Sequence, residues 1–145
     1  MNTLNNKQID NILKNFKLYD KCIMTDEGYK LKNNHYYVVN LNNSKQNGSH
    51  WCGLYYNKDK SIYFDSYGYY PDKEIEKYLN SYDYSNKQIQ DLYSSSCGFY
   101  SIAFIIYMIN NNNNLKGFTD MFNDNFKLNE RILYDYLKKF NIVKI

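Results

Sequence analysis

Hydrophobic residues recur at helical spacing near both ends of the chain. The first stripe consists of Leu4, Ile9, Ile12, Leu13 and Phe16. It predicts a helix that begins after Thr3, and the Thr3 hydroxyl can cap this helix. The second predicts an amphipathic helix over residues 129–140, with an inward face of Ile132, Leu133, Tyr136, Leu137 and Phe140. Cys97 to Ile109 is apolar on every side, so we expect a helix buried inside the domain, preceded by the capping serines 94–96.

Strand patterns lie between these helices. Tyr36 to Leu41 is rich in aromatic and β-branched residues. His50 to Tyr56 and Ser61 to Ser66, separated by the polar residues 57–60, predict a β-hairpin. Polar loops are expected at 19–28 and 42–49, a short helix at 72–79 after Pro71, and a further short strand at 88–93. The pattern predicts one α+β domain over residues 1–145, a small mixed sheet with antiparallel strands packed on the buried helix.

Composition excludes several classes of protein. The chain has 145 residues, 43% hydrophobic and 23% charged, which is typical of a single globular domain. The net charge of +3 includes one arginine and no dense basic stripe, so DNA binding is not indicated. No apolar run approaches the roughly 20 residues that span a bilayer, and the first residues lack a secretory pattern. Three widely spaced cysteines without a CxxC motif argue against disulfides and a zinc site, and favour an intracellular setting.

Cys97 is the first candidate for chemistry. It lies at the first turn of the buried helix, where unpaired N–H groups and the helix dipole favour the negative charge of a thiolate. Gly98 has no side chain, which lets a substrate carbonyl approach the backbone. The alternative is a buried cysteine that only packs, and position alone does not decide between the two.

The hairpin supplies a candidate partner for the thiol. With a loop at residues 57–60, Cys52 faces Asp65, and His50 lies on the same face of the sheet. His50 and Asp65 are then diagonal neighbours with Cα atoms ~7–8 Å apart. A carboxylate beside an imidazole fixes its tautomer and stabilises its charged form, as a general base requires. The alternative is an ordinary surface ion pair.

The remaining candidates are less well determined by spacing. Trp51 either fills the core or covers a substrate groove beside His50. Gln90 can aim an amide N–H beside the Cys97 N–H to form an oxyanion hole, and Gln88 can do the same if the segment is extended. The other histidine, at position 35, has no carboxylate at a suggestive spacing, and the other two cysteines are interpreted as packing residues.

In this order, the residues resemble the adenovirus-type (adenain-like) cysteine endopeptidases, whose relatives occur in virophages, Polinton-like elements and large DNA viruses, and more distantly the SUMO-deconjugating proteases. Three blocks carry the resemblance across most of the chain. They are the histidine block Gly48-Ser49-His50-Trp51, the acidic block Tyr63-Phe64-Asp65-Ser66-Tyr67-Gly68, and the nucleophile block, in which Gln90 is followed after seven residues by Cys97-Gly98-Phe99-Tyr100. That interval of seven residues favours Gln90 over Gln88 as the oxyanion-hole side chain. Asn129-Glu130 and the last helix resemble the family's C-terminal helix.

The resemblance implies a papain-like cysteine-protease domain. Cys97 would be the nucleophile, His50 the general base, Asp65 its orienter and Gln90 the oxyanion-hole side chain. Trp51 and Gly98 would contact the substrate. Such enzymes cleave viral capsid or core precursors at Gly-containing sites, within the host cell's virus factory and inside the virion. We expect a monomer without a cofactor or a bound metal.

Two features differ from the adenoviral members. No cysteine lies between Asp65 and Cys97, so a disulfide-linked activating peptide is not expected, and the sparse positive charge argues against stimulation by DNA. Other functions stay open: a deconjugase of a ubiquitin-like modifier, or a packaging or scaffold protein that keeps the fold without catalysis. The presence of all four proposed catalytic residues argues against the scaffold role.

Overall fold

A computed structural model describes residues 1–25, 30–41 and 50–143 of the chain. The elements, in chain order, are α1 (Asn6–Leu13), β1 (Tyr19–Met24), β2 (His35–Asn40), β3 (Trp51–Tyr56), β4 (Ser61–Phe64), α2 (Lys73–Glu76), β5 (Tyr82–Tyr84), α3 (Cys97–Asn110), α4 (Leu115–Thr119) and α5 (Phe126–Lys138). The predicted loop at 42–49 and the Asp26–Gly28 part of the 19–28 loop lie outside the described residues.

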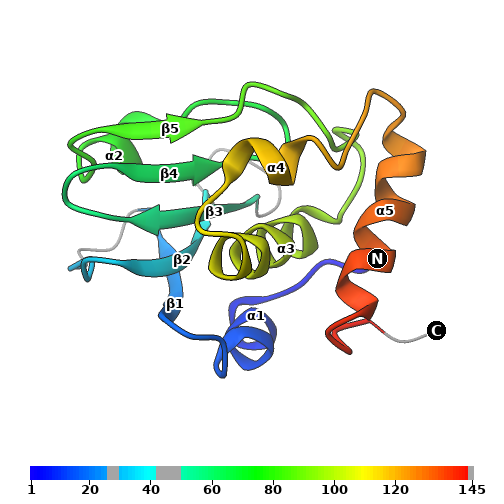
Figure 1. The fold of residues 1–145 in the computed structure, drawn as a ribbon, viewed down its shortest axis with the longest axis horizontal. Coiled ribbons are helices and arrows are strands. Elements are labelled where there is room, and N and C mark those ends of the chain that lie inside the picture. The colour runs from blue at the N-terminus through cyan, green and yellow to red at the C-terminus, as the bar shows by residue number, and fades with distance from the viewer. Residues whose placement is uncertain (26–29, 42–49, 144–145) are drawn as a thin grey trace.

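The five strands form one mixed sheet in the order β1-β2-β3-β4-β5 (Figure 1). The two outer pairs, β1 with β2 and β4 with β5, are parallel, whereas β2–β3 and β3–β4 are antiparallel. One face of the sheet packs on α3, which lies between the sheet and α5 (Figure 1). The opposite face forms a smaller core with Ile75 of α2 and Leu79. Two hydrophobic layers therefore enclose the sheet.

Helix α3 is buried almost throughout its length, as its uniformly apolar sequence predicts. Its close approach to β3 depends on Gly53, because a Cβ there would come within 2.8 Å of Phe104 Cε2 and closer still to Cδ2. The Phe104 ring in turn stacks on Phe64 of β4 at 5.1 Å. The missing side chain at Gly53 thus sets the distance between α3 and the β3–β4 hairpin.

We expect Gly53→Ala to lower the free energy of unfolding by about 1–3 kcal/mol, because the added methyl group overpacks the contact with Phe104. Urea denaturation of the variant, with Asp59→Ala in the exposed hairpin loop as the control, measures the effect. Equal stability of both variants and wild type would contradict this packing role.

Several predicted elements differ from the structure. The first helix is capped by Asn5 rather than Thr3, through a reciprocal bond with Gln8. A strand, β1, replaces the predicted loop at 19–25, and β5 lies at 82–84 instead of 88–93. Both are polar edge strands that draw their hydrogen bonds from an inner neighbour, so local composition does not indicate them. The backbone N–H groups of Ile89 and Gln90 bond to the Ser66 carbonyl rather than to a ladder.

The remaining helices also depart from the prediction. The helix after Pro71 is limited to α2, with Asp72 as its N-cap. α4 was not predicted and follows the turn that the asparagine run forms. The last helix begins earlier than expected, with Asn125 as its N-cap. Within the described residues, no helix is both long and apolar enough to cross a membrane.

Candidate active site

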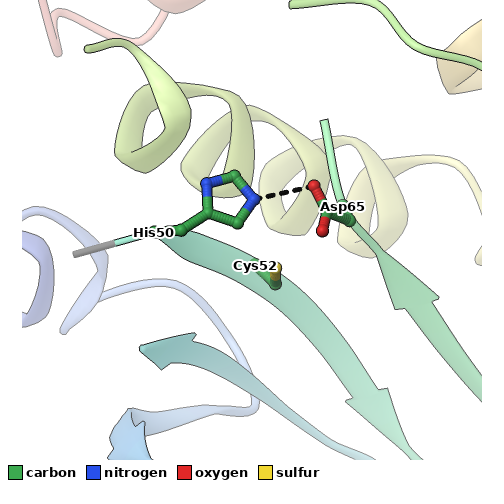
Figure 2. A group of neighbouring side chains, drawn as sticks. All are labelled: His50, Cys52 and Asp65. Carbon is green, nitrogen blue, oxygen red and sulfur yellow. Dashed lines mark hydrogen bonds and ion pairs between the residues drawn. The ribbon is translucent and has the colours of Figure 1, made fainter. Parts of the chain in front are cut away.

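The β3–β4 hairpin has the predicted register. Gly53 pairs with Phe64 and Leu54 with Tyr63, so the next residues outward place Cys52 opposite Asp65. Asp65 follows β4 directly and His50 precedes β3, both on the same side of the hairpin. Figure 2 shows the result: His50 Nε2 and Asp65 Oδ1 lie 2.7 Å apart, within hydrogen-bond distance. The predicted juxtaposition of the two side chains is present.

Tyr67 also holds the imidazole ring and its carboxylate partner in place. Tyr67 stacks on it with ring centroids 4.2 Å apart and planes 8° from parallel. The backbone N–H of Tyr67 also donates to Asp65 Oδ1 at 2.8 Å, which fixes the carboxylate. Gly68 then turns the chain with a φ of 83°, a left-handed conformation that favours glycine. A single turn thus supplies the carboxylate and the stacking ring.

The electrostatic setting of His50 favours its charged form. Burial by itself lowers the pKa of the ring, but its interactions with Cys52, Asp65 and Cys97 raise it. The net pKa of His50 lies above its ordinary value of 6.5. Burial raises the pKa of Cys52 to about 12, so that thiol is uncharged near pH 7.

This shift predicts a pH-dependent stability. With a raised folded-state pKa, the full contribution of His50 is present below about pH 6.5 and decreases as the pH rises toward the folded-state value. We expect the difference in unfolding free energy between wild type and His50→Gln to fall by up to about 1.4 kcal/mol per pH unit above 6.5. Urea denaturation at pH 6, 7 and 8 measures it, with His35→Gln as the control. A difference that grows with pH would contradict the prediction.

Cys97 is the first residue of α3 and is 5% exposed. The electrostatic surroundings of His50 include Cys97, and this interaction raises the pKa of the ring. The ring nitrogen that does not bond to Asp65, Nδ1, is buried and has no hydrogen bond of ordinary geometry within the described residues. Figure 2 shows this nitrogen pointing away from Asp65. Catalytic hydrogen bonds are often long before substrate binds.

Gln90 is fully buried and contacts the segment that precedes Cys97. Its Oε1 accepts a hydrogen bond from Ser66 Oγ at 2.5 Å, and its Nε2 donates to the Ser94 carbonyl at 3.0 Å. The alternative, Gln88, donates instead to the Gln90 carbonyl at 3.0 Å. Gln90 is therefore the one of the two that is linked to both the acidic block and the residues before Cys97. The same Nε2 carries a second N–H group, which is the candidate donor to a substrate oxyanion.

Trp51 and Gly98 lie against each other. The indole is 2% exposed and donates to the Leu4 carbonyl at 3.0 Å. A Cβ at Gly98 would come within 3.3 Å of Trp51 Cδ1, so the glycine makes room for the indole. Packing thus accounts for both residues, and their contact with substrate stays a prediction.

A cavity of about 440 Å³ opens beside the imidazole. It is lined by His50 and Asp65, and otherwise by Leu41, Tyr67, Tyr69, Tyr70, Asp72 and Leu92. Tyr69, Tyr70 and Leu92 are more than half exposed, which is unusual for large apolar side chains. An aromatic groove therefore lies next to the His50 imidazole.

His50, Cys52 and Asp65 are also the side chains that could hold a metal ion. One ligand atom of each lies within 4.8 Å of the others, and the donors are nitrogen, sulfur and oxygen, which suit zinc. Two of the three already bond to each other, and the fully buried Cys52 carries a neutral thiol. This donor set fits an imidazole braced by a carboxylate better than a resident metal ion.

Sequence reasoning did not assign roles to Ser66, Tyr67 or Glu130. Tyr67 was visible as part of the acidic block, two residues after Asp65, but its stacking on His50 was not predicted. Ser66 and Glu130 contact the site through residues distant in sequence, and no local pattern indicates such contacts.

The comparisons with known proteins concern the fold. No family model matches the sequence, and no curated protein is similar enough to match. Two crystal structures of the ASFV pS273R protease do match at 16% identity: the selenomethionine form has a TM-score of 0.62 over 99% of this chain and 69% of that one. The other has a TM-score of 0.59 over 91% of this chain and 66% of that one. This chain spans about two thirds of that protease, and its predicted cysteine-protease fold is confirmed at the level of that likeness.

Proposed function

We propose that the chain is a cysteine endopeptidase that cleaves viral capsid or core precursors during particle maturation. The observation that carries the proposal is the grouping of Cys97, His50 and Asp65 at the ends of α3, β3 and β4. A nucleophile beside a base that a third group orients is the arrangement of nucleophilic catalysis. The fold likeness to a viral protease supports the proposal.

The reaction follows from these positions. The Cys97 thiolate attacks the peptide carbonyl carbon, and the negative charge moves to the carbonyl oxygen. The Cys97 backbone N–H and the second N–H of the Gln90 amide, whose first N–H bonds to Ser94, stabilise this oxyanion. His50 then donates its proton to the leaving amine as the C–N bond breaks, which leaves a thioester on Cys97.

The second half of the reaction restores the enzyme. His50, now neutral, removes a proton from water, and the hydroxide attacks the thioester. The C–S bond breaks, the carboxylic acid leaves, and the thiolate–imidazolium pair forms again. Asp65 and Tyr67 keep the ring in one orientation through both halves, so its two nitrogens keep separate roles.

The substrate is expected to be small at the scissile bond. Trp51 packs against Gly98 and Tyr67 stacks on the imidazole, so we expect bulky side chains next to the scissile bond to clash with these rings. Cleavage at Gly-containing sites by a monomer acting in the assembling particle fits this crowding.

The test is co-expression of the chain with the major capsid precursor of the same virus, followed by intact mass spectrometry. Wild type should shorten the precursor at a defined site, and Cys97→Ala should leave it whole. Equal processing by both would reject the proposal. Labelling of Cys97 by a ubiquitin-like protein with a C-terminal electrophile, without precursor cleavage, would indicate the deconjugase instead.

We expect activity not to depend on a metal ion, because His50 and Asp65 bond directly to each other and Cys52 is neutral. Dialysis against EDTA should leave the rate of peptide cleavage unchanged while elemental analysis shows that metals are removed. A loss of activity that added Zn²⁺ restores would contradict this prediction and support a metal at His50, Cys52 and Asp65.

A further inference from the structure

Helix α5 reaches the segment that precedes the nucleophile through one carboxylate. Glu130 Oε1 accepts a hydrogen bond from Ser96 Oγ at 2.6 Å and another from Ser94 Oγ at 3.0 Å. Ser96 is the N-cap residue of α3, and its hydroxyl makes no capping bond to its own helix. A serine at this position usually caps the helix. Here it bonds across the domain to Glu130.

The same segment connects to Gln90 and to the acidic block. The Ser94 carbonyl accepts from Gln90 Nε2, and Gln90 Oε1 accepts from the hydroxyl of Ser66, the residue after Asp65. Hydrogen bonds therefore run from Glu130 through Ser94 and Gln90 to Ser66. We call this chain of contacts the Glu130 network. It joins the parts of the chain that carry the nucleophile, the oxyanion donor and the carboxylate.

The residue before Glu130 holds the start of the loop at residues 89–96, whereas Glu130 holds its end. Asn129 is fully buried, and its Nδ2 donates to the Ile89 carbonyl at 2.9 Å and to the Asn123 carbonyl at 2.6 Å. Ile89 directly precedes Gln90. Two consecutive residues of α5 thus hold residue 89 at one end of the loop and residues 94 and 96 at the other.

Burial of one Glu130 carboxylate oxygen costs solvation free energy, which argues that this contact has a role. Glu130 Oε2 is buried and has no hydrogen-bond partner within the described residues. Burial raises the pKa of the nearby Tyr100, and its interaction with Glu130 raises it further. The two serine hydroxyls on Oε1 only partly offset the loss of solvation at Oε2.

We propose that Glu130 is a positioning residue of the active site. The inference rests on the proposed roles of Cys97 and Gln90. By holding Ser94 and Ser96, the carboxylate fixes the backbone N–H of Cys97, and by fixing the Ser94 carbonyl it fixes the Gln90 amide. Both oxyanion donors are set by one group that touches neither substrate nor the reacting atoms. Charged acceptors make stronger hydrogen bonds than neutral ones, so a carboxylate holds the segment better than an amide.

The kinetic test compares Glu130→Ala and Glu130→Gln with wild type on a peptide taken from the precursor cleavage site. Glu130→Ala should lower kcat by about tenfold to a hundredfold, with KM changed by no more than about threefold. Glu130→Gln, which keeps an acceptor oxygen, should lie between. Asp135→Asn removes an exposed carboxylate from the same helix and should match wild type. A KM effect without a kcat effect would overturn the inference.

A double-mutant cycle tests the specific contact. If Glu130 acts through Ser96, the Ser96→Ala, Glu130→Ala double variant should lose no more kcat than Glu130→Ala alone. Losses that multiply would mean independent effects and would contradict the inference. Ser96→Ala by itself removes only the hydrogen bond to Glu130 and should also lower kcat, so this variant tests the contact even if Glu130→Ala does not fold.

Amide hydrogen exchange separates this inference from the proposed function. Exchange at residues 94–98 should accelerate about tenfold or more in Glu130→Ala, while the core of α3 stays as in wild type. If wild type cleaves no peptide, the proposed function fails, but this exchange result still tests the positioning. Unchanged exchange at residues 94–98 in both Glu130 variants would overturn it.

Discussion

Cys97→Ala is expected to abolish precursor cleavage, with a loss on the order of 10⁴–10⁶ in kcat. The sulfur is the atom that would form the covalent intermediate, and no other side chain at the start of α3 can replace it. Cys97→Ser should be almost as inactive, because a hydroxyl beside an imidazole tuned for a thiol is a much weaker nucleophile. Steady-state cleavage of the precursor peptide measures both variants.

The control for this prediction is Cys22→Ala, which removes a half-buried thiol that bonds to Tyr19 and Asn6. It should retain wild-type kcat. Thermal unfolding of the Cys97 variants should stay near wild type, because their side chains are close to cysteine in size. Cleavage that survives in a folded Cys97→Ala variant would exclude this residue as the nucleophile.

His50→Ala should lower kcat by about 10⁴ or more, because the ring both stabilises the thiolate and protonates the leaving amine. Asp65→Asn should lose about 10²–10⁴, since an amide in place of the carboxylate favours the wrong tautomer of His50. Tyr67 still holds the ring in that variant through stacking. Steady-state kcat values of the two single variants and of the double variant measure these losses.

The double variant His50→Ala, Asp65→Asn should be no slower than His50→Ala alone, because Asp65 acts only through the ring. An Asp65→Asn variant with full activity would mean that the 2.7 Å bond has no catalytic role. His35→Ala, at the start of β2, is the matched histidine control and should match wild type.

The hairpin could be predicted in detail because its determinants are local. The loop length and the alternation of side chains fix the register, and that register places His50 and Asp65 on one face. The central helix could also be predicted, because a segment that is apolar on all sides has to be buried. These two elements are sufficient to position most of the proposed site.

The edge strands could not be predicted for a physical reason. β1 contains Asp20 and Lys21 and β5 contains Asp83, and the backbone groups of these strands bond to β2 and β4, which lie elsewhere in the sequence. The loop before Cys97 is similar, because its conformation depends on Ser66 and Glu130. Contacts of this kind are set by the tertiary fold and leave no periodic signal.

The measurement that tests the central claim most directly is the alkylation rate of Cys97 by iodoacetamide at pH 6. If Cys97 and His50 form one unit, wild-type Cys97 should react much faster at this pH than glutathione does, and the advantage should disappear in His50→Ala. A Cys97 that reacts no faster than glutathione in wild type, or equally fast with and without His50, would contradict the account.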